Sequence, residues 1–181
     1  YICPVSNSLK NEMINFGLKG NYYCVPNVVD TKLFYPKIVK TKKYTIVHIS
    51  TLTNPQKNIV GILNAISKLS KIRTDFVFKV IGSNDISIVK NTINELQIPK
   101  KCIQLYGFKS PTEISKILQS ANLYISFSNY ETFGIVMCEA LACGTPVIST
   151  KTGILNELSF SNAVSLIPIA DEKALLKNVI R

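Results

Sequence analysis

Short β-rich runs alternate with helix-patterned segments from Lys43 onward, and this alternation is the strongest constraint on the fold of the chain. Apolar residues recur every three or four positions in the segments that separate the runs. Strands that alternate with helices predict an α/β fold with a parallel, doubly wound sheet. The six expected strands are Thr45–Ser50, Phe76–Ile81, Ile103–Tyr106, Leu123–Phe127, Pro146–Ser149 and Val164–Ile167.

The order of these strands predicts where a ligand binds. Doubly wound sheets of six strands commonly have the order 3-2-1-4-5-6, and ligands bind beyond the carboxyl ends of the strands where this order reverses. The reversal falls between the first and fourth strands, which precede loops 51–58 and 128–133. Topology alone therefore places Lys57 and Glu131 at the expected ligand site.

The loop from Ser50 to Asn58 leads from a strand into a helix. Such a connection presents backbone N–H groups and the positive end of a helix, which suit a phosphate. Lys57 adds a full positive charge. The loop has neither the Walker sequence nor the G-x-G-x-x-G fingerprint, so an exposed lysine near a helix start is the alternative interpretation.

The segment from Gly134 to Cys143 predicts a short helix that is ended by Gly144. Its residues are apolar on every side, which is typical of a buried helix. Glu139 lies in the middle of it, and a buried carboxylate must be paired or hydrogen-bonded. We expect its partner to be either a lysine or amide of the core, or a pair of vicinal hydroxyls such as a ribose diol.

The start of the same helix is a second candidate for anion binding. The amides of Gly134, Ile135 and Val136 should have no partner within the helix, so an anion could bind to them. Glu131, just before the helix, would repel that anion unless it binds neutral sugar hydroxyls. Capping of the helix by the acid is the alternative, because the helix dipole favours a negative charge there.

A turn that contains Gly107 and Phe108 follows the third strand. Gly107 permits close approach of the backbone, and a nucleobase could rest on the ring of Phe108. A plain turn before a helix explains the same residues. Ser110, Pro111 and Glu113 form the start signal of that helix, with a serine cap, proline at the first position and glutamate three residues after the cap.

Length and charge limit the classes of function. The 181 residues, 46% of them apolar, suffice for one domain with a sizeable core, and no run is long enough to span a membrane. A net charge of +10 favours anionic ligands or surfaces. The lysines are scattered, without a basic stripe or interleaved aromatic residues, which argues against nucleic acid. Four lysines form a local cluster: Lys37, Lys40, Lys42 and Lys43. This cluster is either a solvated linker or a contact with a membrane surface.

Metal binding and nucleophilic catalysis are not indicated. The five cysteines form no C-x-x-C pair, and His48 is the only histidine, so we expect no metal site and a reducing, cytoplasmic compartment. His48 lies inside the first strand and is expected to be structural. The chain begins with Tyr1 rather than Met and is expected to be a fragment of a longer protein. Its first 36 residues, with the end of a strand, one helix and an extended linker, stand outside the alternating pattern.

Glu131 and Glu139, with seven residues between them, resemble the E-x7-E motif of retaining glycosyltransferases of family 4. The surrounding sequence ETFGIVMCEALACGTPVIST is similar to the signature of that family. VSNSLKNEMINFG and VPNVVDTKLFYP resemble its inter-domain segment, and STLTNPQKN occupies the place of its phosphate-binding loop. The resemblance covers essentially the whole chain.

The resemblance implies one half of a GT-B fold, in which two Rossmann-like domains face each other across a cleft. Residues 1–36 would be the tail of the N-terminal acceptor domain with the inter-domain linker, and residues 37–181 the C-terminal nucleotide-sugar-binding domain. The implied donor is a UDP- or GDP-linked sugar, and the implied acceptor a glycan or lipid-linked sugar bound by the other domain. Donor binding without transfer is expected of the fragment, in the cytoplasm or at the inner face of the membrane, with no cofactor or metal.

The resemblance also implies the role of each site residue. Glu131 would bind hydroxyls of the donor sugar, Lys57 the diphosphate, and Glu139 the ribose diol. Lys57 and Glu131 are the implied catalytic residues. The complete implied donor site is Ser50, Thr51, Lys57, Gly107, Phe108, Glu131, Thr132, Phe133, Gly134, Ile135, Val136 and Glu139.

Several positions depart from the family pattern. Ser50 and Thr51 replace the Gly and Arg of its phosphate-binding loop, which removes one cation from the diphosphate site. Asn58 replaces the Gly after the lysine, Val28 a Gly of the linker, and Ile154 the second Gly of a later turn. A sugar-nucleotide epimerase and a phosphorylase with pyridoxal phosphate, both of GT-B architecture, are the alternative functions.

Overall fold

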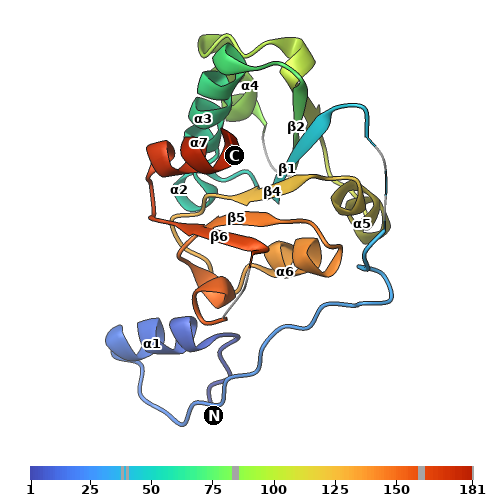
Figure 1. Cartoon of the computed structure of the whole chain (residues 1–181). Coiled ribbons are helices and arrows are strands. Elements are labelled where there is room, and N and C mark those ends of the chain that lie inside the picture. Colours follow the sequence, from blue (N-terminus) through green and yellow to red (C-terminus); the bar gives the residue numbers. More distant parts are fainter. Residues whose placement is uncertain (38, 40, 83–85, 159–161, 181) are drawn as a thin grey trace.

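A six-stranded parallel sheet forms the centre of the fold in the computed structural model, which describes residues 1–37, 39, 41–82, 86–158 and 162–180 (Figure 1). The strand order is β3-β2-β1-β4-β5-β6, so the predicted doubly wound α/β fold is confirmed. The strands are β1 Tyr44–Ser50, β2 Phe76–Gly82, β3 Ile103–Tyr106, β4 Leu123–Ser126, β5 Val147–Thr150 and β6 Val164–Ile167.

Helices cover both faces of the sheet. Helices α3 (Ile59–Ile72), α4 (Ser87–Glu95) and α7 (Glu172–Ile180) pack on one face, and α5 (Pro111–Gln119) and α6 (Ile135–Ala142) on the other (Figure 1). Successive side chains of a strand point to opposite faces, and Ile46 of β1 accordingly joins one core cluster whereas Val47 and Ile49 join the other. Burial on both sides explains why the strands read as nearly continuous apolar runs.

The predicted helix boundaries of α5 and α6 are confirmed. The Ser110 hydroxyl accepts from the Glu113 amide while the Glu113 carboxylate accepts from the Ser110 amide, which completes the expected capping box of α5. Gly144 follows the last turn of α6 with a φ of +79°, a conformation that favours glycine. The sequence analysis missed the 3₁₀ helices η1 (Lys100–Cys102) and η2 (Gly153–Asn156).

The loop after β1 holds a short helix, α2 (Asn54–Lys57), that was not predicted. Lys57 is its last residue and stands two positions before the start of α3 (Ile59–Ile72). Asn58 separates α2 from α3 in the left-handed conformation, with a φ of +48°, and its side chain accepts a hydrogen bond from the Gly61 amide. Asparagine tolerates this conformation better than most residues, which explains how it replaces glycine here.

The N-terminal segment contains the expected helix, α1 (Asn7–Asn15), but not the expected strand end. Its only β contact among the described residues is an isolated bridge between Ile2 and Tyr22. Ser6 caps α1 and is fully buried, because its hydroxyl also donates to the carbonyl of Thr132 at 2.7 Å. The prediction of a strand end at Val5 and Ser6 was wrong because these residues have no neighbouring strand to pair with among the described residues.

The linker that follows α1 runs along the outside of the domain and ends in its core (Figure 1). Phe34 is only 4% exposed and packs in the cluster beneath α5 and α6. In the lysine cluster, Lys37, Lys42 and Lys43 are exposed, and Lys40 lies outside the described residues. None of the helices in the described part of the chain combines the length and the apolar character that a membrane crossing requires.

Candidate functional site

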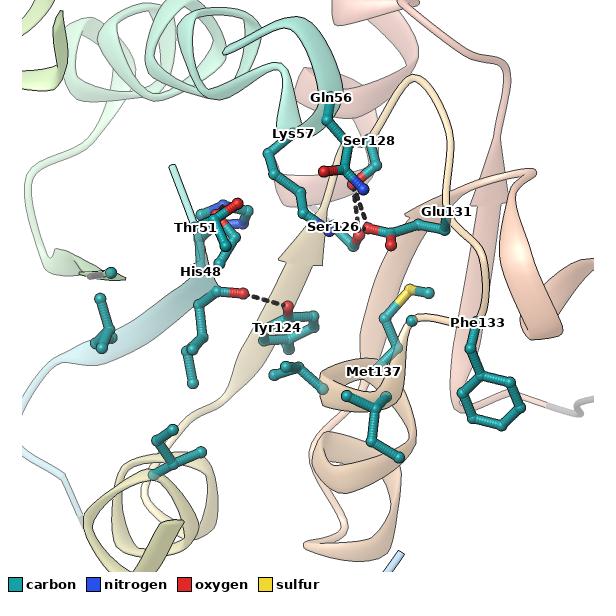
Figure 2. Close-up of a pocket in the computed structure, with 18 of the residues that line it drawn as sticks. His48, Thr51, Gln56, Lys57, Tyr124, Ser126, Ser128, Glu131, Phe133 and Met137 are labelled. Carbon is teal, nitrogen blue, oxygen red and sulfur yellow. Dashed lines mark hydrogen bonds and ion pairs between the residues drawn. The ribbon is translucent and has the colours of Figure 1, made fainter. Parts of the chain in front are cut away.

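A cavity of about 460 Å³ lies at the carboxyl ends of β1 and β4, where the strand order reverses (Figure 2). Ten of the twelve residues of the implied donor site line it: Ser50, Thr51, Lys57, Phe108, Glu131, Thr132, Phe133, Gly134, Ile135 and Val136. Gly107 and Glu139 are not among the described residues that line it. The fold therefore brings three distant loops to one cavity.

Lys57 and Glu131 meet in this cavity as an ion pair. The Nζ atom of Lys57 lies 2.6 Å from Oε1 of Glu131, and the two side chains are only 16% and 8% exposed. The Ser128 hydroxyl donates to the same carboxylate oxygen at 2.7 Å. Figure 2 shows the lysine reaching down from α2 toward the acid on the loop after β4. Sequence topology predicted that these residues are neighbours, but not that they bind each other.

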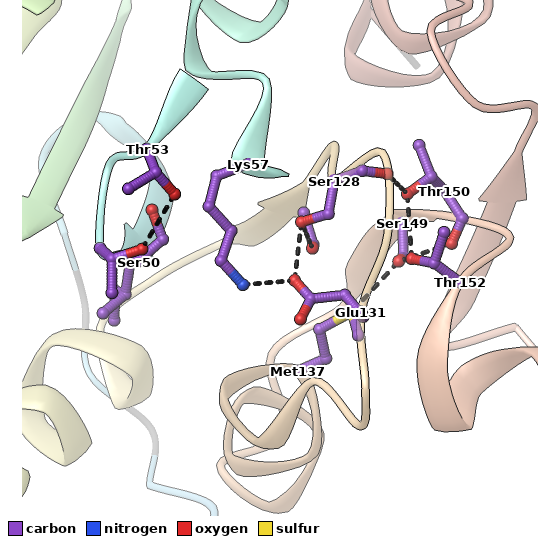
Figure 3. A network of polar contacts seen from close by, with 12 residues as sticks. Ser50, Thr53, Lys57, Ser128, Glu131, Met137, Ser149, Thr150 and Thr152 are labelled. Atoms are coloured by element: carbon purple, nitrogen blue, oxygen red, sulfur yellow. Dashed lines mark hydrogen bonds and ion pairs between the residues drawn. The ribbon is translucent and has the colours of Figure 1, made fainter. Parts of the chain in front are cut away.

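Buried hydroxyl groups hold the loop that carries Glu131 (Figure 3). Thr150, at the end of β5, donates its hydroxyl to the carbonyl of Ser128 at 2.6 Å and lies 3.3 Å from the hydroxyl of Thr152. The Asn129 amide donates to the carbonyl of Gln56 in α2 at 2.8 Å. The loops of Lys57 and Glu131 are thus fastened to each other by backbone contacts as well as by the ion pair.

The start of α6 forms part of the cavity wall, where Gly134, Ile135 and Val136 line it. Gly134 precedes α6 in a left-handed conformation, with a φ of +89°, and no side chain among the described residues caps the helix. The first amides of a helix have no partner within it, so the N–H groups near Ile135 and Val136 can bind an anion. Glu131 does not cap this helix, because its carboxylate accepts from Lys57 and Ser128 instead.

Helix α6 is less buried than its sequence predicts. Only Met137 and Ala140 of its eight residues are buried, and the remainder are half-exposed. The prediction of full burial was wrong because one side of α6 borders the cavity and its outer side is not covered by the described chain. An apolar helix surface of this kind indicates that a further element or ligand can pack there.

Glu139 is half-buried and has no hydrogen-bond or ion-pair partner among the described residues. Burial raises the pKa of its carboxyl to about 7. The expectation of a partner lysine in the core is therefore not met, and the carboxylate stays available to a ligand that donates hydrogen bonds. Such a group, poised to ionise near neutral pH, is common at functional sites.

His48 and Tyr124 form part of the cavity wall, and sequence reasoning did not nominate them. Burial is the main cause that lowers the pKa of His48 to about 4, so the imidazole is neutral. Burial likewise raises the pKa of Tyr124, whose hydroxyl donates to the carbonyl of Ile49 at 3.1 Å. Both side chains are thus structural, as expected for His48. The alternation of side-chain direction along β1 and β4 was the sequence signal that could have placed His48 and Tyr124 at the cavity.

Phe108 and Lys109 border the mouth of the cavity. The ring of Phe108 is 75% exposed, so one face is free for stacking. Lys109 lines the cavity and pairs with Glu113 at 2.9 Å, a contact that the sequence analysis did not foresee. A Cβ atom added to Gly107 would meet nothing within 4 Å, which leaves open space beside this turn. No group of three His, Cys, Asp or Glu side chains in the described residues could hold a metal ion.

A doubly wound parallel sheet with a cavity at its switch point defines a Rossmann-like domain. The family model described as "Glycosyl transferases group 1" matches residues 30–181, and the chain belongs to this family. Its six-stranded parallel sheet has the Rossmann-like arrangement of GT-B glycosyltransferase structures.

Individual relatives agree with this assignment. A probable sucrose-phosphate synthase of Thermosipho melanesiensis is 28% identical over 162 residues, which cover 82% of this chain and 37% of the relative. The sucrose-phosphate synthase structure from Thermosynechococcus elongatus superimposes with a TM-score of 0.86 at 20% identity, over 99% of this chain and 48% of that one.

A structure of TarM from S. aureus in complex with Fondaparinux, alpha-GlcNAc-glycerol and UDP gives a TM-score of 0.83. Its identity to this chain is 19%, and the match covers 99% of this chain and 36% of TarM. This chain thus spans between about a third and a half of the length of these three proteins.

Proposed function

We propose that this chain binds a nucleoside-diphosphate sugar in the cavity between β1 and β4, as the donor half of a retaining glycosyltransferase of family 4. The observation that carries the proposal is the ion pair of Lys57 and Glu131, held at 2.6 Å on the switch point of the sheet. It places a cation for phosphate beside a carboxylate for hydroxyl groups. The complex of the structurally similar TarM with UDP supports a nucleoside diphosphate as ligand.

In the proposed complex, the diphosphate lies between Lys57 and the start of α6. An ammonium group has three N–H donors, and Glu131 occupies one of them, so Lys57 can bind phosphate without breaking the ion pair. The free amides near Ile135 and Val136 supply further donors. Thr51 stands where the family pattern has arginine, and its hydroxyl lies 3.2 Å from the hydroxyl of Thr53.

In the proposed complex, Glu131 binds the sugar and Glu139 binds the nucleoside. Oε2 of Glu131 accepts no hydrogen bond from the described residues and would accept from the donor sugar, while Oε1 stays bound to Lys57 and Ser128. Glu139 would accept from the two ribose hydroxyls. The exposed ring of Phe108 would support the base, with Gly107 leaving room for it.

The reaction we propose breaks the bond between the anomeric carbon of the sugar and the diphosphate oxygen. An acceptor hydroxyl bonds to that carbon on the same face, and its proton passes to the released diphosphate. Lys57 and the α6 amides stabilise the negative charge that develops on the leaving group, which requires neither metal nor cofactor in this proposal. Fixed dipoles and charges of this kind are often the largest contribution to catalysis.

The acceptor and the location of the whole enzyme also belong to the proposal. We propose a glycan or lipid-linked acceptor that is bound by a second domain, and a cytoplasmic location with a peripheral contact to the inner face of the membrane. The exposed lysines Lys37, Lys42 and Lys43 suit an anionic surface.

A thermal-shift screen tests donor binding. UDP- and GDP-linked sugars are added to the wild-type chain and to the variants Lys57→Ala and Glu131→Ala, and the ligand-induced rise in Tm is compared. We expect a clear rise for one nucleotide class in the wild type and a reduced rise in both variants. Lys68→Ala is the matched control, because it breaks an ion pair with Glu172 between α3 and α7, and neither residue lines the cavity. An undiminished rise in both test variants would refute the site.

A further inference from the structure

His48 and Ser50 form a directed chain of hydrogen bonds that ends on the backbone of a cavity loop. Nδ1 of His48 lies 2.9 Å from the carbonyl oxygen of Ile125, and Nε2 lies 2.8 Å from the Ser50 hydroxyl. A carbonyl oxygen can only accept, so Nδ1 carries the proton of the neutral ring. Nε2 then accepts from the Ser50 hydroxyl, whose oxygen in turn accepts from the Leu52 amide at 2.9 Å.

Burial keeps the imidazole in this series of hydrogen bonds in one protonation state. His48 is 1% exposed, and its lowered pKa of about 4 leaves it neutral over the range in which the protein is expected to work. The direction of each bond is therefore fixed: Leu52 to Ser50, Ser50 to His48, and His48 to Ile125. A glycine at position 50, as in the family pattern, could make neither of the two bonds of the serine hydroxyl.

Leu52, whose amide donates to the Ser50 hydroxyl, has an unfavourable backbone conformation. Leu52 has a φ of +59°, a left-handed conformation that is unfavourable for a residue with a Cβ and needs compensation by its surroundings. Its side chain is 2% exposed and packs against the end of β2, where a Cβ on Gly82 would lie only 2.3 Å from its Cγ. The Ser50 hydroxyl and the absence of a side chain at Gly82 together make this turn possible.

The conformation of this turn determines where the polar groups of the loop after β1 lie in the cavity. Thr51 stands between the two linked residues and lines the cavity, and the carbonyl of Thr53 accepts from the Lys57 amide at 2.8 Å. The direction in which α2 leaves β1 therefore depends on the conformation at Leu52. Loss of the Ser50 hydroxyl would let the turn relax and shift Thr51 and Lys57 together.

We propose that His48 and Ser50 are positioning residues for the diphosphate of the donor, acting through the turn at Leu52 on Thr51 and Lys57. This inference rests on the proposed function. It assigns to the serine–histidine pair the task of shaping a loop that lacks the arginine of the family pattern. The pair should affect the phosphate part of the ligand and leave the nucleoside part unaffected, because Phe108 lies in the turn after β3 and Glu139 in α6.

The test compares a nucleotide with its nucleoside. Affinities of UDP and uridine, and of GDP and guanosine, are measured for the wild-type chain, Ser50→Ala and Ser50→Thr by calorimetric and NMR titration. For whichever nucleotide binds, we expect Ser50→Ala to weaken it about fivefold and its nucleoside less than about twofold, since one hydrogen bond is worth about 1 kcal/mol and about 1.4 kcal/mol is a factor of ten. Ser50→Thr retains the hydroxyl and should recover most of the loss.

Ser67→Ala is the matched control for a general loss of stability. Ser67 is 4% exposed in α3 and donates its hydroxyl to the Leu96 carbonyl at 3.2 Å, away from the cavity, so both affinities should be unchanged. Equal weakening of nucleotide and nucleoside by Ser50→Ala, or no weakening of either, would overturn the positioning role while leaving donor binding intact. Failure of the wild-type chain to bind UDP or GDP would overturn the proposed function as well.

Discussion

Lys57 and Glu131 stand 74 positions apart in the sequence, yet Nζ of the lysine lies 2.6 Å from Oε1 of the glutamate. Both side chains are largely removed from solvent, and Ser128 adds a hydrogen bond to the same oxygen. The pair therefore joins the loop after β1 to the loop after β4 at the point where the sheet reverses its order. It links the stability of the cavity walls to the groups that would bind a donor.

This burial predicts strong coupling between the two charges. Lys57→Met and Glu131→Gln should each lower the free energy of unfolding by about 1–3 kcal/mol, because each leaves a desolvated partner. The double variant should lose clearly less than the sum, with a coupling of about 1–2 kcal/mol. Urea denaturation of the four proteins measures it. The more exposed pair Lys68–Glu172 is the control, and an equal coupling in both pairs would contradict the prediction.

Donor affinity should rise with pH through the raised pKa of Glu139. The folded-state pKa of about 7 lies above the ordinary value, so the protonated carboxyl favours the fold at low pH and this contribution is lost as pH rises toward 7. Ribose hydroxyls donate to the ionised form. Because only about a tenth of the carboxyls are ionised one pH unit below the pKa, affinity should fall about tenfold from about pH 8 to about pH 6.

Nucleotide sugars are suitable ligands for this titration, since a diphosphate esterified at both ends has no proton that dissociates near neutral pH. His48 does not contribute, because its pKa of about 4 keeps it neutral over the whole range. Glu139→Gln should bind the donor more weakly and with a flat pH profile. A slope in this variant equal to that of the wild type would show that another group titrates.

Gly153 should be needed for the shape of the Glu131 loop. Its φ is +62°, and an added Cβ would lie 2.5 Å from the carbonyl oxygen of Phe133 and 3.0 Å from Cβ of Glu131. Gly153→Ala is therefore expected to cost at least about 1 kcal/mol of stability and to weaken donor binding as well. Gly107→Ala is the control for stability, because its Cβ would meet nothing. Equal stability of both variants in urea would refute the prediction.

The capping box of α5 should contribute measurably to stability. Ser110→Ala removes the hydroxyl that accepts from the Glu113 amide, and we expect a loss of about 1 kcal/mol in urea denaturation. Thr112→Ala, one residue past the proline of the same helix turn, is the matched control and should change stability by less than about 0.5 kcal/mol. A loss no larger than that of the control would mean that α5 is held by its apolar face alone.

The fold was predictable because its signals are local. Alternating strand and helix patterns gave the order β3-β2-β1-β4-β5-β6, and Ser110, Pro111 and Glu113 gave a helix start at the correct residue. The errors also have local causes. The four residues of α2 are too few to show a helical period, and the strand expected before α1 lacks a neighbouring strand to pair with.

The sequence by itself determined the class of fold, the switch point of the sheet, and the presence of Lys57 and Glu131 near it, because strand topology follows from periodicity. Only the tertiary structure decided how these groups are used. It paired Lys57 with Glu131, left Glu139 half-buried without a partner among the described residues, and linked His48 through Ser50 to the turn at Leu52. Hydrogen bonds and desolvation depend on distances of a few ångströms between segments far apart in the chain, and no sequence period encodes such distances.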